Sequence, residues 1–324
     1  MYKAHIDGEY FTNFADADPT LRPDGQMLYR FGKAIKDEKM VQFGQWAKQN
    51  FYRLDLTSFY KMRQLENILT TKTIEKGDKY QPLKDAWVSD IQVLTARTDK
   101  GLYLATHGGH NAESHNHNDV GDFIIYADGQ PMIIDAGRGN YTARTFSSKR
   151  YELWFTQSEY HNLPIINGLG QKAGREFEAK NVKSDINDKE VHLQMDIAAA
   201  YPKEAGIASW NRTVKLNRVR NQVELSDDYV LNSQPNALKQ VFMTVCTIED
   251  NQKGQIILRG LKNAQLALNY DPNLWTVSTE QPSAEGMEYS SFKTKWGKNP
   301  VMRIILTHKL LTAKGKHIFT FEKK

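Results

Sequence analysis

The longer, C-terminal part of the chain alternates apolar and polar residues with a period of two. From about Asp90 onward, alternating segments follow one another with turn residues between them, among them "DIQVLTART", "GLYLATHGG", "EFEAKNVKSDI", "SWNRTVKLN", "KQVFMTVCTI", "EYSSFKTKW" and "GKHIFTFEKK". Asp128-Gly129 separates two apolar runs and is a hairpin signal. This pattern predicts a mainly β fold, built as a large antiparallel β-sandwich.

The first ninety or so residues carry a helical period instead. Apolar residues recur at helical spacing in "QMLYRFGKAI", through Leu28, Phe31 and Ile35, and again in "EKMVQFGQWAKQ". A third helix is predicted over "TSFYKMRQLENIL", with Thr57 or Ser58 as its N-cap. Three helices of this length cannot bury much apolar surface alone.

These two patterns predict two domains. We expect an α-helical segment at residues 1–88 and the β-sandwich at residues 89–324. A long insertion from Thr142 to Gly174 interrupts the strand pattern. Insertions of this length inside compact domains are usually functional.

Composition narrows the classes of function. The 324 residues carry a formal net charge of +5, with basic residues scattered along the chain. A solvated, slightly basic surface explains this net charge, and binding of an acidic ligand is the more specific alternative explanation. Nothing favours nucleic acid, because there is no basic helix and no paired Cys/His finger. We expect no membrane span, since no apolar run reaches about 18 residues.

Cysteine usage and the start of the chain add two expectations. Cys246 is the only cysteine, which excludes an intrachain disulfide and a cysteine zinc site, and its apolar run "VFMTVCTI" predicts a buried thiol. The start "MYKAHIDGEYF" has no apolar core of a secretory signal.

The stretch "SHNHND" concentrates the candidate chemistry. His115 and His117 are two residues apart, so in an extended segment both rings would point to the same face. Asp135 ends the apolar run "PMIID", where a carboxylate is costly unless it is paired or binds a cation, and His161 lies in the insertion. Two histidines and one aspartate form a three-ligand set that suits zinc, with a fourth position open.

Alternatives remain at each position. Two surface histidines in a polar loop would explain the His-x-His pair if it stood alone, and Asp119 and Asp122 are alternative oxygen ligands. His107 and His110 flank Gly108-Gly109 and are expected to line the same site or to face solvent. Three other histidines lie in alternating strand segments and are expected to be structural: His192, His308 and His317.

The order of these elements resembles a known family. "GGHNAESHNHNDVGDFIIYADGQPMIIDAG" followed by "RYELWFTQSEYHNLPIING" is similar to the heparinase II/III-like polysaccharide lyases. The resemblance implies an N-terminal (α/α) toroid followed by an antiparallel β-sandwich domain. It also implies that zinc is bound at the positions of His117, Asp135 and His161.

The resemblance further implies the roles of the residues around the metal. His115 corresponds to a catalytic histidine at the cleft, and Tyr151 matches a second catalytic tyrosine, with Tyr141 as the reserve. His110 and Asn116 are the candidate substrate-binding residues. Such enzymes cleave uronic-acid polysaccharides of the heparin, heparan sulfate or alginate type by β-elimination, and act in the periplasm or outside the cell.

One departure from the family bears on activity. In relatives, the group that neutralises the substrate carboxylate and the principal tyrosine come from the toroid, and none of the tyrosines before residue 61 matches that tyrosine: Tyr2, Tyr10, Tyr29, Tyr52 and Tyr60. We therefore interpret the chain as the C-terminal part of a polysaccharide lyase. The alternative is a non-catalytic zinc β-sandwich that binds acidic glycans or a helical partner, and a zinc hydrolase with Asp119 as general base is a third reading.

The resemblance also sets the expected partners. They are an acidic polysaccharide or oligosaccharide, a helical domain or helical partner, and a second copy of the chain.

Overall fold

The computed structural model describes residues 1–51, 60–77, 79–283, 285–297 and 299–324. These residues form two compact units. The first unit comprises Met1–Phe11 and Thr20–Leu83, and the second comprises Thr12–Pro19 and Lys84–Lys324. Residues 12–19 therefore belong to the β unit although they precede the helices in the chain.

The first unit contains the predicted helices. They are α1 (Gly25–Ile35), α2 (Glu38–Phe51) and α3 (Lys61–Thr70), preceded by a hairpin of β1 (His5–Asp7) and β2 (Tyr10–Phe11). Gly25 and Gly44 let α1 and α2 approach closely, because a Cβ on Gly44 would lie 2.4 Å from the backbone nitrogen of Tyr29. The predicted N-caps Thr57 and Ser58 lie outside the described residues.

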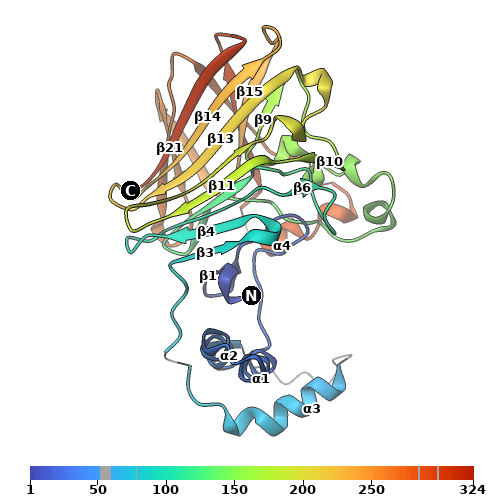
Figure 1. Cartoon of the computed structure of the whole chain (residues 1–324), viewed down its shortest axis with the longest axis vertical. Coiled ribbons are helices and arrows are strands. Elements are labelled where there is room, and N and C mark those ends of the chain that lie inside the picture. Colours follow the sequence, from blue (N-terminus) through green and yellow to red (C-terminus); the bar gives the residue numbers. More distant parts are fainter. Residues whose placement is uncertain (52–59, 78, 284, 298) are drawn as a thin grey trace. The chain divides into compact units, whose positions relative to one another are not determined.

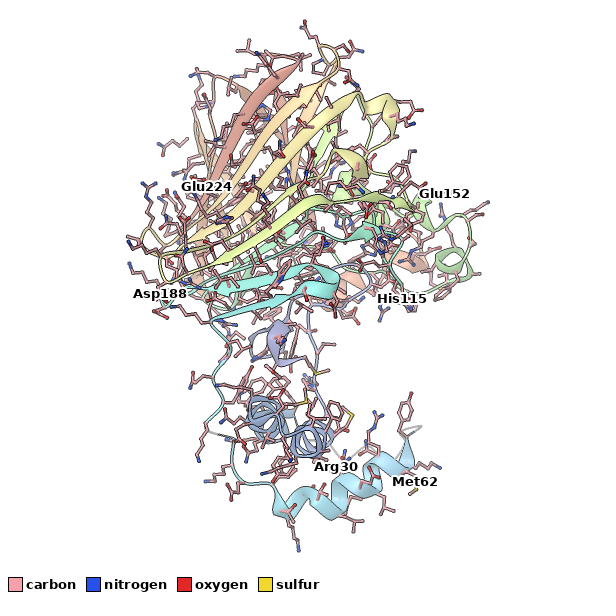
Figure 2. All side chains as sticks on the ribbon, in the orientation of Figure 1. Arg30, Met62, His115, Glu152, Asp188 and Glu224 are labelled. Atoms are coloured by element: carbon pink, nitrogen blue, oxygen red, sulfur yellow. The ribbon has the colours of Figure 1, made fainter. Side chains whose placement is uncertain are left out.

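Helix α3 is joined to α1 by polar side chains. Arg30 of α1 donates to Asn67 of α3 at 2.8 Å, and Asn67 donates to Asp24, the N-cap of α1, at 2.9 Å. Several apolar side chains of the two helices are exposed: Phe31, Ile35, Met62, Leu65, Ile68 and Leu69. Figure 2 shows Met62 at one end of α3, pointing away from the helix. Within the described part of this unit, the helices therefore leave an apolar surface open to solvent.

The second unit is the predicted antiparallel β-sandwich, and the mainly β fold class is confirmed (Figure 1). Its strands and single α-helix, within the described residues, are β3 (Asp85–Val88), β4 (Val93–Arg97), β5 (Leu102–His107), β6 (His110–Asn111), β7 (Phe123–Ala127), β8 (Gln130–Ile133), β9 (Pro164–Ile166), β10 (Gly174–Glu178), β11 (Lys180–Ile186), β12 (Glu190–Asp196), β13 (Ile207–Asn217), β14 (Gln222–Leu231), β15 (Leu238–Thr244), β16 (Thr247–Gln252), β17 (Gln255–Arg259), β18 (Gln265–Asn269), β19 (Trp275–Glu280), β20 (Met302–His308), β21 (Lys314–Lys323) and α4 (Phe292–Lys295).

Three sheets share the core of this unit. Their strand orders are β11-β12-β13-β14-β21-β18-β17-β16, β19-β20-β15-β9 and β3-β4-β5-β7-β8, and all their pairings are antiparallel. One aromatic from each sheet meets at the centre, where the rings of Phe123, Phe242 and Phe321 lie 5.3–6.2 Å apart in edge contacts. Strands β5 and β7 of the five-stranded sheet are buried on both faces.

The predicted hairpin at Asp128-Gly129 is present. Both residues have positive φ, 50° and 70°, as a two-residue turn between twisted strands requires. The prediction for "EYSSFKTKW" was wrong, because this segment forms a short turn and α4. Phe292 and Trp296 are four residues apart and both buried, which is helical spacing.

The insertion at residues 142–174 has defined structure. It contains four 3-10 turns and β9: the turns are Ala143–Phe146, Arg150–Glu152, Trp154–Thr156 and Ser158–Tyr160. Among the residues described, no helix is both long and apolar enough to cross a lipid bilayer.

Candidate metal centre and cleft

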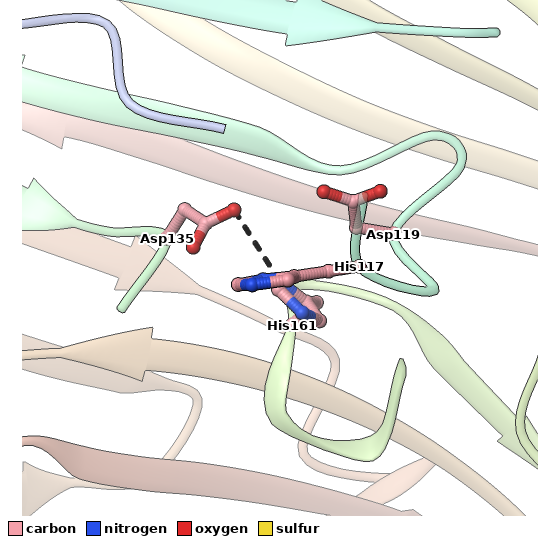
Figure 3. Close-up of side chains that lie close together, drawn as sticks. All are labelled: His117, Asp119, Asp135 and His161. Carbon is pink, nitrogen blue, oxygen red and sulfur yellow. Dashed lines mark ion pairs between the residues drawn. The ribbon is translucent and has the colours of Figure 1, made fainter. Parts of the chain in front are cut away.

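Four buried side chains converge at one end of the five-stranded sheet. His117, Asp119, Asp135 and His161 each offer a ligand atom, and these atoms all lie within 4.8 Å of one another (Figure 3). His117 and Asp119 come from the loop between β6 and β7, Asp135 follows β8, and His161 follows the last 3-10 turn of the insertion. The sequence-predicted ligands are thus brought together, and Asp119 adds a fourth donor.

The polar atoms of this cluster fit a cation. Nδ1 of His117, both ring nitrogens of His161, and Oδ2 of Asp119 and Asp135 are buried without a hydrogen-bond partner in the described part of the chain. Such atoms are costly to bury, and a divalent cation would satisfy them together. A set of two imidazoles and two carboxylates matches the chemistry of zinc sites.

Burial and charge act against each other in this cluster. Burial alone would lower the pKa of His161, but the carboxylates of Asp135 and Asp122 raise it well above its ordinary value. Burial likewise opposes ionisation of Asp135, yet the imidazole of His161 holds the pKa of Asp135 below its usual range. Burial raises the pKa of Asp119. The buried carboxylates therefore favour a positive charge beside them, as a proton on His161 or as a bound cation.

A second layer of hydrogen bonds holds His161 in place. The side chain of Asn162 donates to the carbonyls of Phe123 and Ile134 at 2.7 and 3.1 Å, and its carbonyl accepts from Met243 N at 2.7 Å. Asp122 accepts from Asn162 N at 2.9 Å, and its other oxygen lies 3.4 Å from Nδ1 of His161. The insertion is thereby fixed to β7 and β15 next to the cluster.

Asp16 joins the cluster to the surface. Its side chain is 4% exposed, and it contacts His117 Nε2 through Oδ1 and His115 Nδ1 through Oδ2, both at 3.1 Å. Arg150 donates to Oδ1 at 2.8 Å, and Tyr141 donates to Oδ2 at 3.1 Å. Burial alone would raise the pKa of Asp16, but the hydrogen bonds and charges of His117 and Arg150 lower it far below its usual value.

His115 and His117 do not share one face, so the prediction of an extended His-x-His pair was wrong. His115 has a φ of 61°, in the left-handed region. Its side chain is 55% exposed, whereas that of His117 is 0% exposed. Figure 2 shows His115 among the loops beside β6. The turn sends one ring outward and the other inward.

The outward ring borders an open groove. This groove has a volume of about 330 Å³ and is lined by residues 14–17, Ser114, His115 and Tyr141. The phenol of Tyr141 lies 3.3 Å from His115 Nδ1. Burial, and then the charge of Asp16, raises the pKa of Tyr141, so its phenol stays protonated at neutral pH. The guanidinium of Arg138 lies 4.5 Å from the centre of the Tyr141 ring and adds positive charge here.

The other predicted site residues are not among those that line this groove. Tyr151 donates to Asn116 Oδ1 at 3.0 Å, and Asn116 Nδ2 donates to the carbonyl of His117 at 2.8 Å, so both ends of the Asn116 amide have protein partners. His110 lines a separate cavity of about 160 Å³ together with His107, Asn116 and Asp119. The structure therefore places Tyr141 rather than Tyr151 against His115, while the roles assigned to Tyr151, His110 and Asn116 stay predictions.

Sequence reasoning missed the residues that act at long range. Asp16, Arg138, Arg150 and Asn162 were not singled out. Asp16 lies 99 and 101 positions from the histidines it contacts, and no local pattern marks it. The only available signal was that its loop, "NFADADP", lies within the resemblance.

These features define a class: a β-sandwich with a buried His/Asp cluster beside an open groove. The Heparinase II/III-like, C-terminal family model matches residues 80–318. The chain belongs to this family. No curated protein sequence matches the chain.

Solved structures share the fold. The heparan sulfate lyase HepC from Pedobacter heparinus aligns with a TM-score of 0.71 and 11% identity, covering 99% of this chain and 45% of that one. A heparinase III gene product aligns with a TM-score of 0.68 and 10% identity over 100% of this chain and 45% of its own. A further heparinase III gives 0.67 and 12%, over 99% and 46%. This chain thus spans less than half the length of these enzymes.

Proposed function

We propose that this chain is the C-terminal part of a polysaccharide lyase that cleaves uronic-acid-containing polysaccharide, of the heparan sulfate or alginate type, by β-elimination. One observation carries the proposal. His115 is bonded through Nδ1 to Asp16, its Nε2 has no hydrogen-bond partner among the described residues, and its ring lines the groove together with Tyr141, whose phenol lies 3.3 Å from Nδ1. An imidazole that can accept a proton and a phenol that can donate one are the two groups that elimination requires.

The residues of the groove have these roles in the proposal. His115 Nε2 removes the C5 proton of the uronate, the C4–O bond breaks as the C4–C5 double bond forms, and a tyrosine gives its proton to the departing oxygen. Tyr141 is the better placed tyrosine, and Tyr151 is the alternative. Arg138 supports binding of an anionic sugar, because its guanidinium lies 4.5 Å from the ring of Tyr141, which lines the groove, and removal of the C5 proton becomes easier when the neighbouring carboxylate is neutralised.

We further propose zinc at the buried cluster, with a structural role. His117, Asp119, Asp135 and His161 would hold the ion, and four protein donors are typical of a closed structural site. When bound, zinc would cross-link the insertion to the ends of β7 and β8 and neutralise the buried carboxylates. The proton transfers belong to His115 and the tyrosine, so they need no hydroxide on a metal.

We propose that the helical unit packs against a further helical domain, on the same chain or on a partner. The exposed apolar residues of α1 and α3 support this, because a surface that includes Phe31, Met62 and Leu69 favours packing against further helices. From the resemblance to polysaccharide lyases we further propose a periplasmic or secreted location. A second copy of the chain is a candidate partner.

Incubation with heparan sulfate, heparin and alginate tests the proposal, with ultraviolet absorbance as the readout for the 4,5-unsaturated product. We expect product from the wild-type chain, alone or with a helical domain supplied, and a loss of about 10²–10⁴-fold in rate for His115→Ala. Metal analysis of the same preparation should find zinc. Glycan binding without product from either form would contradict lyase activity and favour a non-catalytic glycan-binding module.

A further inference from the structure

The carboxylate of Asp16 is shared between two histidines that face opposite ways. Oδ1 lies 3.1 Å from Nε2 of His117, whose ring is fully buried, and Oδ2 lies 3.1 Å from Nδ1 of His115, whose ring faces the groove. Arg150 and Tyr141 complete its surroundings as donors. A buried carboxylate with four hydrogen-bond partners, two on each oxygen, has a fixed orientation.

This arrangement dictates which nitrogen of each imidazole carries a proton. An ionised carboxylate only accepts hydrogen bonds, so the ring nitrogen that faces it must be the donor. His117 then presents Nδ1, which has no hydrogen-bond partner among the described residues, to the cluster of Asp119, Asp135 and His161. His115 is left with its lone pair on Nε2, and its ring lines the groove.

We propose that Asp16 is a positioning residue that sets both tautomers, and so couples the metal centre to the catalytic histidine. A metal-binding histidine commonly donates its other N–H to a carboxylate, which orients the ring and strengthens its binding. Here the same carboxylate also orients His115. The part of this inference that concerns catalysis rests on the proposed lyase function, and the part that concerns the metal centre does not.

The local backbone supports a dedicated role for Asp16. Ala15 has a φ of 57° and His115 a φ of 61°, and neither is glycine, so both backbones are in a conformation that costs free energy. Between them, Asp16 N donates to the carbonyl of His115 at 3.2 Å. These two strained residues bring the carboxylate of Asp16 against both rings.

Asp16→Asn is the test variant. It keeps the volume of the side chain but leaves one acceptor oxygen for the N–H groups of two imidazole rings. The matched control is Asp18→Asn, in the same loop. Asp18 pairs with Arg138 at 3.0 Å and with Lys295, and it contacts neither histidine in the described structure. Zinc affinity of the intact chain is measured by competition with a chelator. We expect Asp16→Asn to weaken zinc binding about 10–100-fold and Asp18→Asn to leave it within about twofold.

Nitrogen-15 NMR of the histidine rings supplies a readout that a general loss of stability would not reproduce. In the wild-type protein, His117 should be protonated at Nε2 and His115 at Nδ1, and Asp16→Asn should yield a mixture of tautomers in at least one ring. On any substrate that the wild type cleaves, Asp16→Asn should lower kcat more than it changes KM.

The outcomes separate this inference from the proposed function. Equal zinc affinity in the two variants, or a wild-type spectrum with the opposite tautomer in either ring, would overturn the role of Asp16. The wild-type spectrum decides even if Asp16→Asn does not fold. An absence of product on every uronide would instead overturn the lyase proposal, while the zinc and NMR results would still decide whether Asp16 sets the tautomers.

Discussion

The burial of His317 predicts how the stability of the β unit changes with pH. Its ring lies 4.7 Å from that of Trp275, 4.9 Å from that of Tyr229 and 4.7 Å from that of His308. Burial, followed by the nearby imidazole of His308, lowers the pKa of His317 to about 3. The folded protein therefore binds this proton much less readily than the unfolded chain does.

The sign of the effect follows from that difference. The stability contributed by a neutral His317 is fully present above the unfolded pKa of about 6.5 and is lost as pH falls toward 3. Between pH 7.5 and pH 5 we expect wild-type stability to fall by about 2 kcal/mol more than that of His317→Phe, which keeps an aromatic ring in place. Urea titrations at both pH values measure the free energy of unfolding, and equal losses would contradict the prediction.

The contacts of Arg150 predict how firmly the insertion at residues 142–174 is held in place. It donates to Asp16 at 2.8 Å, to the carbonyl of Asn116 at 2.9 Å and to that of Thr145 at 3.3 Å, and its side chain is 12% exposed. Hydrogen bonds from a buried charged group contribute about 1.5–3 kcal/mol each. We expect Arg150→Met to speed amide hydrogen exchange in residues 143–157 at least about tenfold.

Arg144→Met is the matched control for the insertion. Arg144 lies in the same segment and pairs only with Glu152 in the described structure, and both side chains are well exposed, at 39% and 55%. Exposed ion pairs contribute little, about 0–1 kcal/mol. Hydrogen exchange followed by mass spectrometry compares the two variants, and similar protection in both would show that Arg150 does not hold the insertion.

The elements that the sequence predicted are those with a local cause. Strands such as β13 and β14 bury alternate residues, so their period of two is visible in the sequence. The segment at α4 was predicted as a strand. Its helical signal is only two aromatic residues, four positions apart, with polar residues between them. His117, Asp135 and His161 were predicted as one site because polar groups beside apolar runs are rare and because their order resembles a family, and the structure brings the three together. Asp16 could not be found, since its partners are set by the fold.

At the scale of the whole molecule, the β unit depends on a segment that precedes the helices. Residues 12–19 contact the β unit with four polar side chains: Thr12 bonds to Tyr103, Asn13 to the carbonyl of Asp135, Asp16 to both histidines, and Asp18 to Arg138. A division of the chain between residues 88 and 89, as the sequence pattern predicts, would separate this segment and β3 from the other strands of the β unit. The metal centre is therefore expected to need residues that come before the helices in the sequence as well as residues that come after them.

A truncated chain of residues 84–324 tests that dependence, because it keeps the four cluster residues and loses Asp16 and Asn13. We expect it to bind zinc about 10–100-fold more weakly than the intact chain while keeping its β-sheet circular dichroism. The control joins residues 12–19 to residue 84 through a flexible glycine-serine linker in place of residues 20–83, which should restore affinity by holding the segment at high local concentration. Equal zinc affinity in the truncated and intact chains would show that the cluster is complete without the segment. The linked segment should restore zinc affinity, and Asp16→Asn in that segment should remove it again. This pair of results would assign the effect to the carboxylate of Asp16 and not to the helices.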